Sequence, residues 1–218
     1  MTKTPLVIWG ASGHAAVVAN IASLCGLWEV VGFIDDVNCD RMAGTFAGKP
    51  FLGGEEALAS LKQKGIRHIA LGFGHCSMRV KKSESLKNDG FELVTLIHPD
   101  AVISDSAIIG EGTVVGAGVI VDPGCKIGRY TILNNSAVIC HGSTIDDGVH
   151  VCPGVRIGGD VHVGACCWIG IGSCVVERLR IGAQSYIGAG SIVTKDIPPG
   201  VLAYGNPARV IRSLTEAF

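Results

Sequence analysis

Sixteen aliphatic residues recur at strict intervals of six from Ile103 to Val193, with no interval skipped and no insertion. An α-helix repeats every 3.6 residues and a β-strand every two, so a period of six fits neither. The period is typical of a parallel β-helix, in which stacked coils cover each other's apolar edges. Because three hexads close one triangular coil, we predict a little over five coils. The residues are Ile103, Ile109, Val115, Val121, Ile127, Leu133, Ile139, Ile145, Val151, Ile157, Val163, Ile169, Val175, Ile181, Ile187 and Val193.

Two other positions of the hexad support this register. A small or apolar residue stands four places after each aliphatic residue, as at Thr113 and Val119. Glycine often stands directly after the aliphatic residue, as at Gly110 and Gly128. We interpret these glycines as corner residues that need a positive φ, which glycine adopts without steric cost.

The chain before residue 100 lacks the repeat and alternates short apolar segments with helical ones. We expect strands at 6–9, 30–34, 68–72 and 93–97, and helices at 15–24, 55–64 and 78–88. Strands that alternate with helices predict a small parallel, Rossmann-like sheet with crossover helices. His98-Pro99 then ends this part, because the residue before a proline is disfavoured in a helix. We therefore predict an α/β domain at 1–98 and a parallel β-helix with a short tail at 99–218.

Composition excludes several classes of protein. The 218 residues carry a formal net charge of −1 with scattered basic residues, which predicts no nucleic-acid partner. The sequence has neither 18 consecutive apolar residues nor a signal peptide, so we expect no membrane association. The nine cysteines are odd in number and contain no C-x-x-C pair, which favours free thiols in a reduced cytosol. We therefore expect a cytoplasmic protein.

Two motifs in the amino-terminal part point to a nucleotide. Gly10 and Gly13 flank a strand–helix junction, where exposed N–H groups can receive a phosphate or diphosphate. Asp35 and Asp36 end the second strand, at the edge where open α/β sheets bind ligands. The spacing is not the full G-x-G-x-x-G of dehydrogenases. Unliganded turns are the alternative explanation for each motif, but together the motifs favour a nucleotide-containing ligand.

His141 is the candidate for acid–base chemistry among the seven histidines. It stands at the third position of its hexad, at a predicted corner, where a side chain can point away from the core. An imidazole has an ordinary pKa near 6.5 and can accept a proton at neutral pH. His150 is half a coil further on and could face the same crevice. The β-helix histidines are nine and twelve residues apart, unlike the two ligands five apart in β-helical zinc carbonic anhydrases, so we predict no metal.

The motifs then occur in the order of one family. Gly10-Ala-Ser-Gly-His14, Phe33-Ile-Asp-Asp36, Leu96-Ile-His-Pro99, the hexads and Gly205-Asn-Pro-Ala-Arg209 are all present. This order resembles the sugar acetyltransferases related to sialic acid O-acetyltransferases, and above all the perosamine type, which N-acetylates GDP-linked 4-amino sugars. The resemblance covers essentially the whole chain. It implies a left-handed β-helix, acetyl-CoA as the donor, a homotrimer with shared active sites, and a role in polysaccharide biosynthesis.

The resemblance also implies roles for individual residues. His141 matches the general base, and Asn134 a polar position of the active site. The positions near the nucleotide-sugar are Gly10, Ser12, Gly13, His14, Asp35 and Asp36. The positions near acetyl-CoA are His150, Gly159, Gly170, Ile171 and Ala189.

Gly142 departs from the family pattern, because several relatives carry an acidic residue directly after the histidine. Either His141 acts without a carboxylate partner, or a backbone carbonyl or a water takes that role, or this copy is weakened. An amine acceptor depends less on an activated base than a hydroxyl does, so the departure favours N-acetylation. The alternatives are O-acetylation of a sialic-acid-type sugar, or a nucleotide-sugar-binding protein that has lost catalysis.

Overall fold

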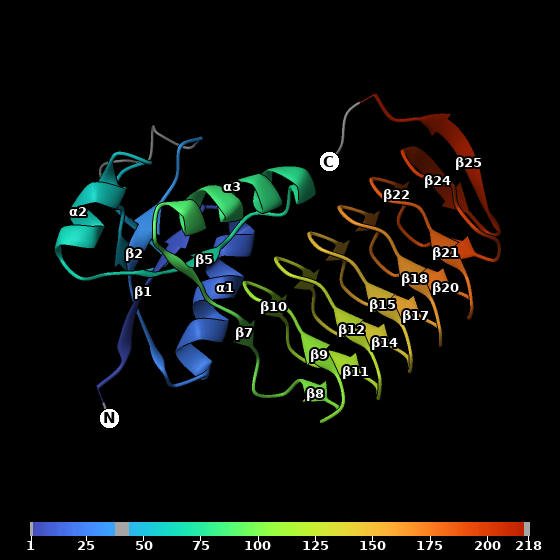
Figure 1. Cartoon of the computed structure of the whole chain (residues 1–218), viewed down its shortest axis with the longest axis horizontal. Coiled ribbons are helices and arrows are strands. Elements are labelled where there is room, and N and C mark those ends of the chain that lie inside the picture. The colour runs from blue at the N-terminus through green and yellow to red at the C-terminus, as the bar shows by residue number, and fades with distance from the viewer. Residues whose placement is uncertain (1, 38–43, 216–218) are drawn as a thin grey trace.

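The computed structural model describes residues 2–37 and 44–215, and it has two parts (Figure 1). The amino-terminal part is a small sheet with helices packed on it. The remainder is a stack of triangular coils that extends away from it, followed by a hairpin. This is the predicted architecture, an α/β part followed by a left-handed β-helix.

The amino-terminal sheet has the strand order β2-β1-β5-β6, and all its strands are parallel. Leu6–Trp9 is buried continuously, as expected for a parallel strand covered on both faces. Along the first helix, Ala15, Val18 and Ala22 are buried at helical spacing, so one face packs on the sheet. The elements are β1 (Thr4–Trp9), α1 (Gly13–Leu24), β2 (Trp28–Ile34), β3 (Thr45–Phe46), β4 (Lys49–Pro50), α2 (Ala57–Gln63), β5 (His68–Leu71), α3 (Cys76–Asn88) and β6 (Glu92–Leu93). No helix within the described ranges is long and apolar enough to span a bilayer.

The strand predicted at 93–97 is in fact two strands with different partners. β6 (Glu92–Leu93) pairs with β5 in the amino-terminal sheet, whereas β7 (Leu96–Ile97) pairs with Val114–Val115 of the β-helix. Ile97 lies six residues before Ile103, so the hexad register already includes it. The first coil therefore begins inside the segment that the apolar pattern assigned to the sheet.

Three sheets form the faces of the β-helix, and within the coils each strand pairs in parallel with the strand 18 residues further on. At the end of the first sheet, β22 pairs with the first strand of an antiparallel hairpin. The first sheet contains β7 (Leu96–Ile97), β10 (Val114–Val115), β13 (Ile132–Leu133), β16 (His150–Val151), β19 (Trp168–Ile169), β22 (Tyr186–Ile187) and the hairpin β24 (Val201–Gly205) and β25 (Ala208–Ser213). The second contains β8 (Val102–Ile103), β11 (Ile120–Val121), β14 (Val138–Ile139), β17 (Arg156–Ile157), β20 (Cys174–Val175) and β23 (Ile192–Val193). The third contains β9 (Ile108–Ile109), β12 (Lys126–Ile127), β15 (Thr144–Ile145), β18 (His162–Val163) and β21 (Arg180–Ile181).

The turns between sheets form three corners of the prism. The first corner joins the first and second sheets, the second corner joins the second and third, and the third corner joins the third and first. The first corner comprises residues 98–101, 116–119, 134–137, 152–155, 170–173 and 188–191. The second comprises 104–107, 122–125, 140–143, 158–161 and 176–179, and the third 110–113, 128–131, 146–149, 164–167 and 182–185.

The core of the stack confirms the predicted register. All sixteen aliphatic residues lie in one apolar cluster or pack against it. The small residues four places later also face inward, and the hydroxyls of the serines and threonines among them bridge successive coils. Ser143 Oγ, for example, donates to the Gly158 carbonyl at 2.9 Å and accepts from the Val161 N–H at 3.1 Å. These buried polar groups are therefore satisfied by the next coil.

The glycines that directly follow the aliphatic residues have a different cause from the predicted one. Gly110 and Gly128 do not have a positive φ. A Cβ on Gly128 would lie 2.5 Å from the Asp147 nitrogen, so the backbone of the next coil leaves no room for a side chain. From residue 110 onward the positive φ falls on the third residue of each corner, as at Gly112 (67°) and Gly142 (68°).

Candidate active site

A pocket of about 350 Å³ lies at the carboxyl ends of β1 and β2. Four residues that the sequence assigned to the nucleotide-sugar line it: Gly10, Ser12, Asp35 and Asp36. The wall is completed by Trp9, Ala11, Val37, Phe73, His75, Met78 and Lys82. The motifs at 10–14 and 35–36 therefore meet in space, as expected at this edge of an open α/β sheet.

Gly10 and Asp35 shape the turn that forms the floor of this pocket. Gly10 has a φ of 118°, and a Cβ there would lie 2.9 Å from the Gly72 carbonyl oxygen. Asp35 is buried, and its carboxylate accepts from the N–H groups of Ala11 and Val37, each at 2.8 Å. Asp35 thus holds the loops after β1 and β2 together.

Lys82 brings a cation into the pocket that sequence reasoning missed. Its ammonium lies 4.0 Å from the centroid of the Trp9 ring and 3.5 Å from Asp36 Oδ2. It also pairs with Glu55 at 3.3 Å. A cation over an indole ring beside a carboxylate can receive a ligand phosphate on one side and a base or ribose on the other. Lys82 belongs to α3, where its position in the sequence resembles that of any solvent-facing lysine.

The start of α1 contributes its backbone to the same region. Ser12 precedes the helix and makes no side-chain cap; its hydroxyl donates to the Gly72 carbonyl at 3.4 Å. Gly13 begins the helix, and a Cβ there would meet no atom within 4 Å. The first N–H groups of a helix favour an anion. The space around Gly13 leaves them accessible to one.

His14 lies against His150, across the junction between the two parts. The ring centroids are 6.0 Å apart, and the Nε2 atoms of both rings are buried without a hydrogen-bond partner among the described residues. Burial, and secondarily the charge of Arg79, lowers the pKa of His14 to about 4. Burial, Arg79 and His14 lower the pKa of His150 to about 3. Both imidazoles are therefore neutral at pH 7, and Trp168 covers His150 at 4.2 Å between centroids.

Arg79 joins the two parts of the chain. It is fully buried, and its guanidinium donates to the carbonyls of Tyr130 and Gly74 at 2.7 Å and of Gly148 at 2.8 Å. Burial lowers its pKa. These bonds link α3 to the third corner of the β-helix. No local sequence pattern indicates this role, because Arg79 stands in a helix rich in charged residues.

His141 lies at the second corner, and its side chain is exposed. Its imidazole covers Gly159 of the next coil, where a Cβ would lie 2.7 Å from Nε2 and 3.1 Å from Nδ1. Gly159 must therefore lack a side chain for the ring to lie there. The structure brings the predicted base and one predicted donor-site residue together.

Gly170, Ile171 and Ala189, which the resemblance also assigns to acetyl-CoA, lie at the first corner. Asn134, the predicted polar position of the active site, lies there too. His150, the remaining residue assigned to acetyl-CoA, lies instead on the first sheet against His14. Asn134 orders its own turn, because its Oδ1 accepts from the Asn135 N–H at 2.9 Å. A Cβ on Gly170 would lie 2.6 Å from the Ala189 nitrogen, so these two residues stack in successive coils. Ile171 is 55% exposed beside them. The first and second corners are the two long edges of the second sheet, so the structure separates these residues from His141 by the width of that sheet.

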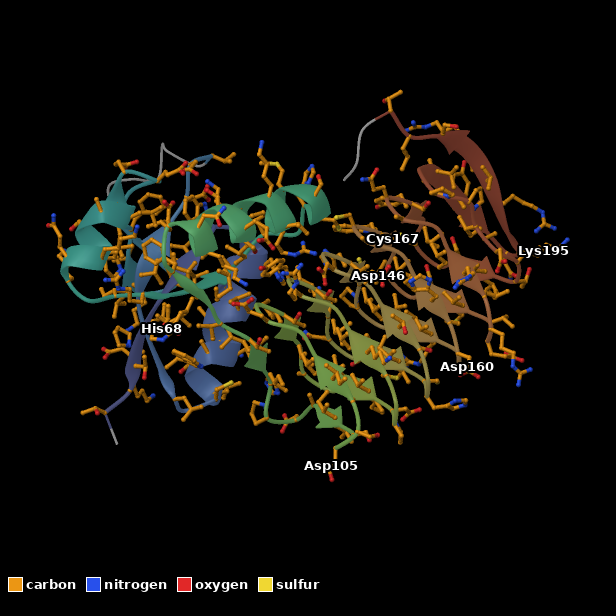
Figure 2. All side chains as sticks on the ribbon, viewed as in Figure 1. His68, Asp105, Asp146, Asp160, Cys167 and Lys195 are labelled. Atoms are coloured by element: carbon orange, nitrogen blue, oxygen red, sulfur yellow. The ribbon has the colours of Figure 1, made fainter. Side chains whose placement is uncertain are left out.

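The pocket and His141 lie on different sides of the prism in one chain. The amino-terminal part covers the first sheet and the third corner through Leu96, Arg79 and His150. The second corner is the edge opposite the first sheet. Figure 2 shows Asp105 and Asp160 of the second corner along the edge of the stack away from α3.

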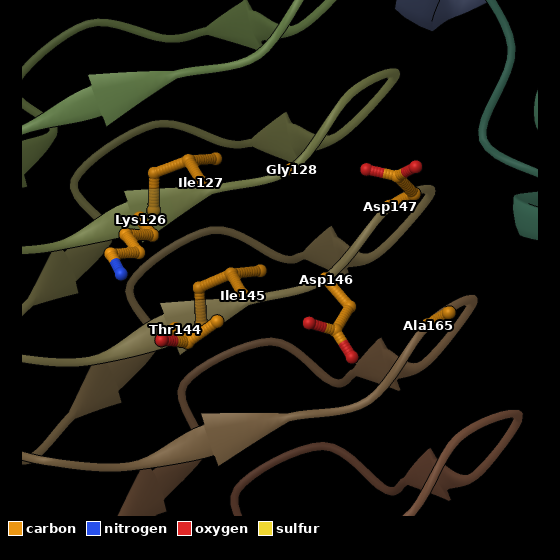
Figure 3. A pocket seen from close by; sticks show the side chains of 8 residues that line it. All are labelled: Lys126, Ile127, Gly128, Thr144, Ile145, Asp146, Asp147 and Ala165. Atoms are coloured by element: carbon orange, nitrogen blue, oxygen red, sulfur yellow. The ribbon is translucent and has the colours of Figure 1, made fainter.

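A second hollow, of about 390 Å³, lies on the third sheet and contains none of the predicted residues (Figure 3). Lys126, Thr144, Asp146 and Asp147 give it a polar wall. Asp146 pairs with His162 at 3.0 Å. Within the described part of the chain, no three His, Cys, Asp or Glu side chains form a group that could hold a metal ion.

Comparison with known proteins shows which families and solved structures this chain resembles. Residues 5–86 match the PglD N-terminal domain family. Perosamine N-acetyltransferase from Caulobacter crescentus, a histidine-to-asparagine variant in complex with CoA and GDP-perosamine, has 33% identity and a TM-score of 0.92 over 97% of this chain and 99% of its own. The acetyltransferase domain of PglB from Neisseria gonorrhoeae, in complex with acetyl coenzyme A, has 35% identity and a TM-score of 0.90, covering 96% and 100%. WeeI from Acinetobacter baumannii has 26% identity and a TM-score of 0.83, also covering 96% and 100%.

The fold and the site define an acyltransferase of the left-handed β-helix class. At this identity over nearly its full length, the chain belongs to the family of sugar acetyltransferases that contains these relatives. It is an acetyltransferase.

Proposed function

We propose that this enzyme transfers an acetyl group from acetyl-CoA to the 4-amino group of a nucleotide-linked amino-dideoxy sugar, with a GDP-perosamine-type sugar favoured. The observation that carries the proposal is the full-length similarity to a perosamine N-acetyltransferase bound to CoA and GDP-perosamine. The pocket supports it, because a lysine, an aspartate and a helix N-terminus converge there. Lys82 and the start of α1 would receive the diphosphate, and Asp36 the ribose or base.

The separation of the pocket from His141 supports an active site shared between copies of the chain. One chain holds its pocket over the first sheet and its His141 at the opposite edge. A second copy could bring its own His141 to the first chain's pocket. Interfaces that each join two different surfaces of the chain form a closed ring when the rotation between copies closes. We propose such a ring, a homotrimer.

The outer faces of the β-helix support the second sheet as the interface of that ring. Its outward residues are mostly apolar: Val102 (64% exposed), Ile120 (38%), Val138, Cys174 and Ile192, with Arg156 the charged exception. The third sheet instead presents Lys126 and Thr144 (Figure 3), together with Ile108, His162 and Arg180. All of these except Ile108 are polar. An exposed apolar face marks an interaction surface. With second sheets facing inward, the first corner of one copy would meet the second corner of its neighbour.

That packing would complete the donor site. Asn134, Gly170, Ile171 and Ala189 lie on one edge of the second sheet, whereas His141 and Gly159 lie on the other. Juxtaposed edges from two copies would form a groove for the pantetheine arm, with His141 of one copy near the thioester.

The chemistry follows from this placement. The sugar amine attacks the thioester carbonyl, so a C–N bond forms while the C–S bond breaks. His141 accepts the proton that the amine loses and returns it to the leaving thiolate of CoA. An amine is nucleophilic when neutral, so His141 need only remove a proton during attack. Much of the rate would come from holding the two substrates in line.

Product analysis tests the reaction. We expect thiol release from acetyl-CoA with 4-amino sugars linked to GDP, and UDP and dTDP analogues identify the base preference. The product should survive hydroxylamine, because an amide resists it and an ester does not. An ester product would establish O-acetylation instead. Nucleotide-sugar binding without turnover of any acceptor would establish the binding-only alternative.

Mixed trimers test the shared site. His141→Asn and Lys82→Met each damage one half of the proposed site. At a nucleotide-sugar concentration well below the wild-type KM, both variants should turn over slowly. If the halves come from different copies, mixtures of the two variants refolded together should then regain activity above that of either alone. Activity that stays at the level of the separate variants in a verified mixed trimer would place both halves in one chain.

A further inference from the structure

Asp160 lies in the second corner, one coil after Gly142. Its N–H donates to the His141 carbonyl at 2.9 Å, and its φ is +58°, a conformation that aspartate tolerates better than most residues. Its side chain is exposed. Figure 2 shows it at the edge of the stack. The residue is thus tied by its backbone to the turn that carries the proposed base.

The carboxylate of Asp160 occupies the space that a side chain at position 142 would need. A Cβ built on Gly142 would collide with Asp160 Oδ1, and it would lie 3.4 Å from Cγ. The imidazole of His141 covers Gly159, the residue directly before Asp160. The ring and the carboxylate therefore belong to the same two coils, each against a glycine. No hydrogen bond or ion pair joins them, and both side chains are exposed and can rotate toward each other.

We propose that Asp160 is a positioning residue for His141: its carboxylate orients the imidazole and favours the protonated ring that forms as the amine attacks. The inference rests on the proposed role of His141 as base. A carboxylate close to an imidazole favours the protonated form and fixes the orientation of the ring. The acidic partner that the sequence lacks at position 142 would then come from the neighbouring coil.

Other charged groups border this corner and set the background for the test. Asp122 lies in the coil before, where together with burial it raises the pKa of the Cys140 thiol. Glu177 and Arg178 lie in the coil after, and the Arg178 N–H donates to the Gly159 carbonyl at 2.9 Å. Asp160 differs from these groups because its oxygen reaches the His141–Gly142 turn itself. Variants at Asp160 leave the other three charges in place.

The first experiment compares Asp160→Asn with Asp105→Asn in the full-length enzyme. Both substitutions remove one exposed carboxylate from the second corner, where Figure 2 labels both residues. Asp105 lies two coils away from His141. We expect Asp160→Asn to lower kcat about tenfold, with the KM of both substrates unchanged. The acidic limb of the kcat/KM–pH profile should move to lower pH, because the charge that favours the protonated ring is gone. Asp105→Asn should change neither quantity.

A relocation variant keeps the inference testable if Asp160→Asn is unstable. Gly142→Asp combined with Asp160→Gly exchanges the carboxylate and the glycine between two turns of positive φ. We expect this double variant to recover most of the lost kcat and to return the acidic limb of the kcat/KM–pH profile to its wild-type position. The inference is overturned if Asp160→Asn and the double variant both fold and neither follows these expectations while His141→Asn is inactive. Full turnover by His141→Asn would instead overturn the proposed base.

Discussion

The amino-terminal pocket and the second corner of the β-helix each carry candidate site residues, but only the pocket is complete within one chain. The loops after β1 and β2, together with α3, meet at one sheet edge, where Lys82 contacts both Trp9 and Asp36. His141 instead projects from an exposed edge, with its proposed donor-site partners on the far side of the second sheet. In the proposed function, substrate selection is thus a property of the single chain, whereas catalysis is a property of the assembly.

The two regions also differ in how the chain marks a functional residue. In the α/β part, each loop has its own conformation, and a functional residue is one of many irregular positions. In the β-helix, every coil repeats the same corner, and a functional residue is a departure from the column to which it belongs. His141 stands where Gly159 and Glu177 stand in later coils. In the β-helix, a candidate site residue can therefore be recognised because it differs from the residues at the same position of other coils.

The largest expected effect is at the corner. His141→Asn should lower kcat by a factor of about 10² to 10⁴, the usual contribution of a general base. Binding of the nucleotide-sugar, measured by calorimetry, should stay as in the wild type, because the pocket lies in a different part of the chain. If His141→Asn lost nucleotide-sugar binding as well as turnover, the pocket and the second corner would not be separate sites.

The next effect concerns the face between the two proposed edges. Ile120→Glu places a charge on the apolar second sheet and should disrupt the trimer, and with it nearly all activity. Ile108→Glu is the matched control, since Ile108 is an exposed aliphatic residue at the same strand position on the third sheet. Sedimentation velocity and turnover measured on both variants show which of the two sheets forms the interface. A trimeric, active Ile120→Glu enzyme would remove the second sheet from the interface.

A third effect lies at the junction of the two regions. His14 and His150 have pKa values lowered to about 4 and about 3 by burial, against an ordinary value of 6.5. Below pH 6.5 the unfolded chain binds protons that the folded chain does not. The free energy of unfolding should therefore fall between pH 6.5 and 4, by roughly 3 kcal/mol for a single histidine with such a shift.

Urea denaturation at a series of pH values measures this loss. The free energy of unfolding of His150→Gln should fall less steeply with pH than that of the wild type. Equal slopes in the two proteins would show that His150 takes up a proton without unfolding.

The smallest effect is within the pocket. Lys82→Met keeps the length of the side chain over Trp9 but removes its charge, so the KM for the nucleotide-sugar should rise about tenfold, or about 1.4 kcal/mol. The KM for acetyl-CoA should be unchanged. Lys81→Met, one position earlier on the exposed surface of α3, is the control. A change in both KM values would argue against a pocket that acts independently of the donor groove.

Much of the fold could be read from the sequence, because strict spacing is a strong signal. The hexads predicted the coils, and the motifs at 10–14 and 35–36 predicted a shared pocket that the structure forms. Ile97 shows a limit of prediction from apolar segments, because the segment 93–97 contains strands of two different sheets. Gly128 shows another, because spacing identifies a position where a side chain is excluded but does not say whether φ or the next coil excludes it.

The site residues that the sequence missed act through contacts that no local pattern encodes. Lys82 and Arg79 are three residues apart on one helix. Lys82 lines the pocket, whereas Arg79 is buried and donates hydrogen bonds to backbone carbonyls. Their difference arises from which face of α3 meets the β-helix. Trp168 likewise reads as an outward residue of a hexad, and only the docking of the amino-terminal part places it over His150.

The eighteen-residue coil sets the step by which a chain of this kind can change length. Removing one complete coil shortens the stack but returns every later residue to its own face. Removing a single hexad turns everything after it by a third of a revolution, so that Gly170 and Ile171 would leave the first corner for another. Natural length variants should therefore differ by multiples of eighteen between His141 and Ala189, whereas insertions of other sizes should be confined to loops that leave the stack.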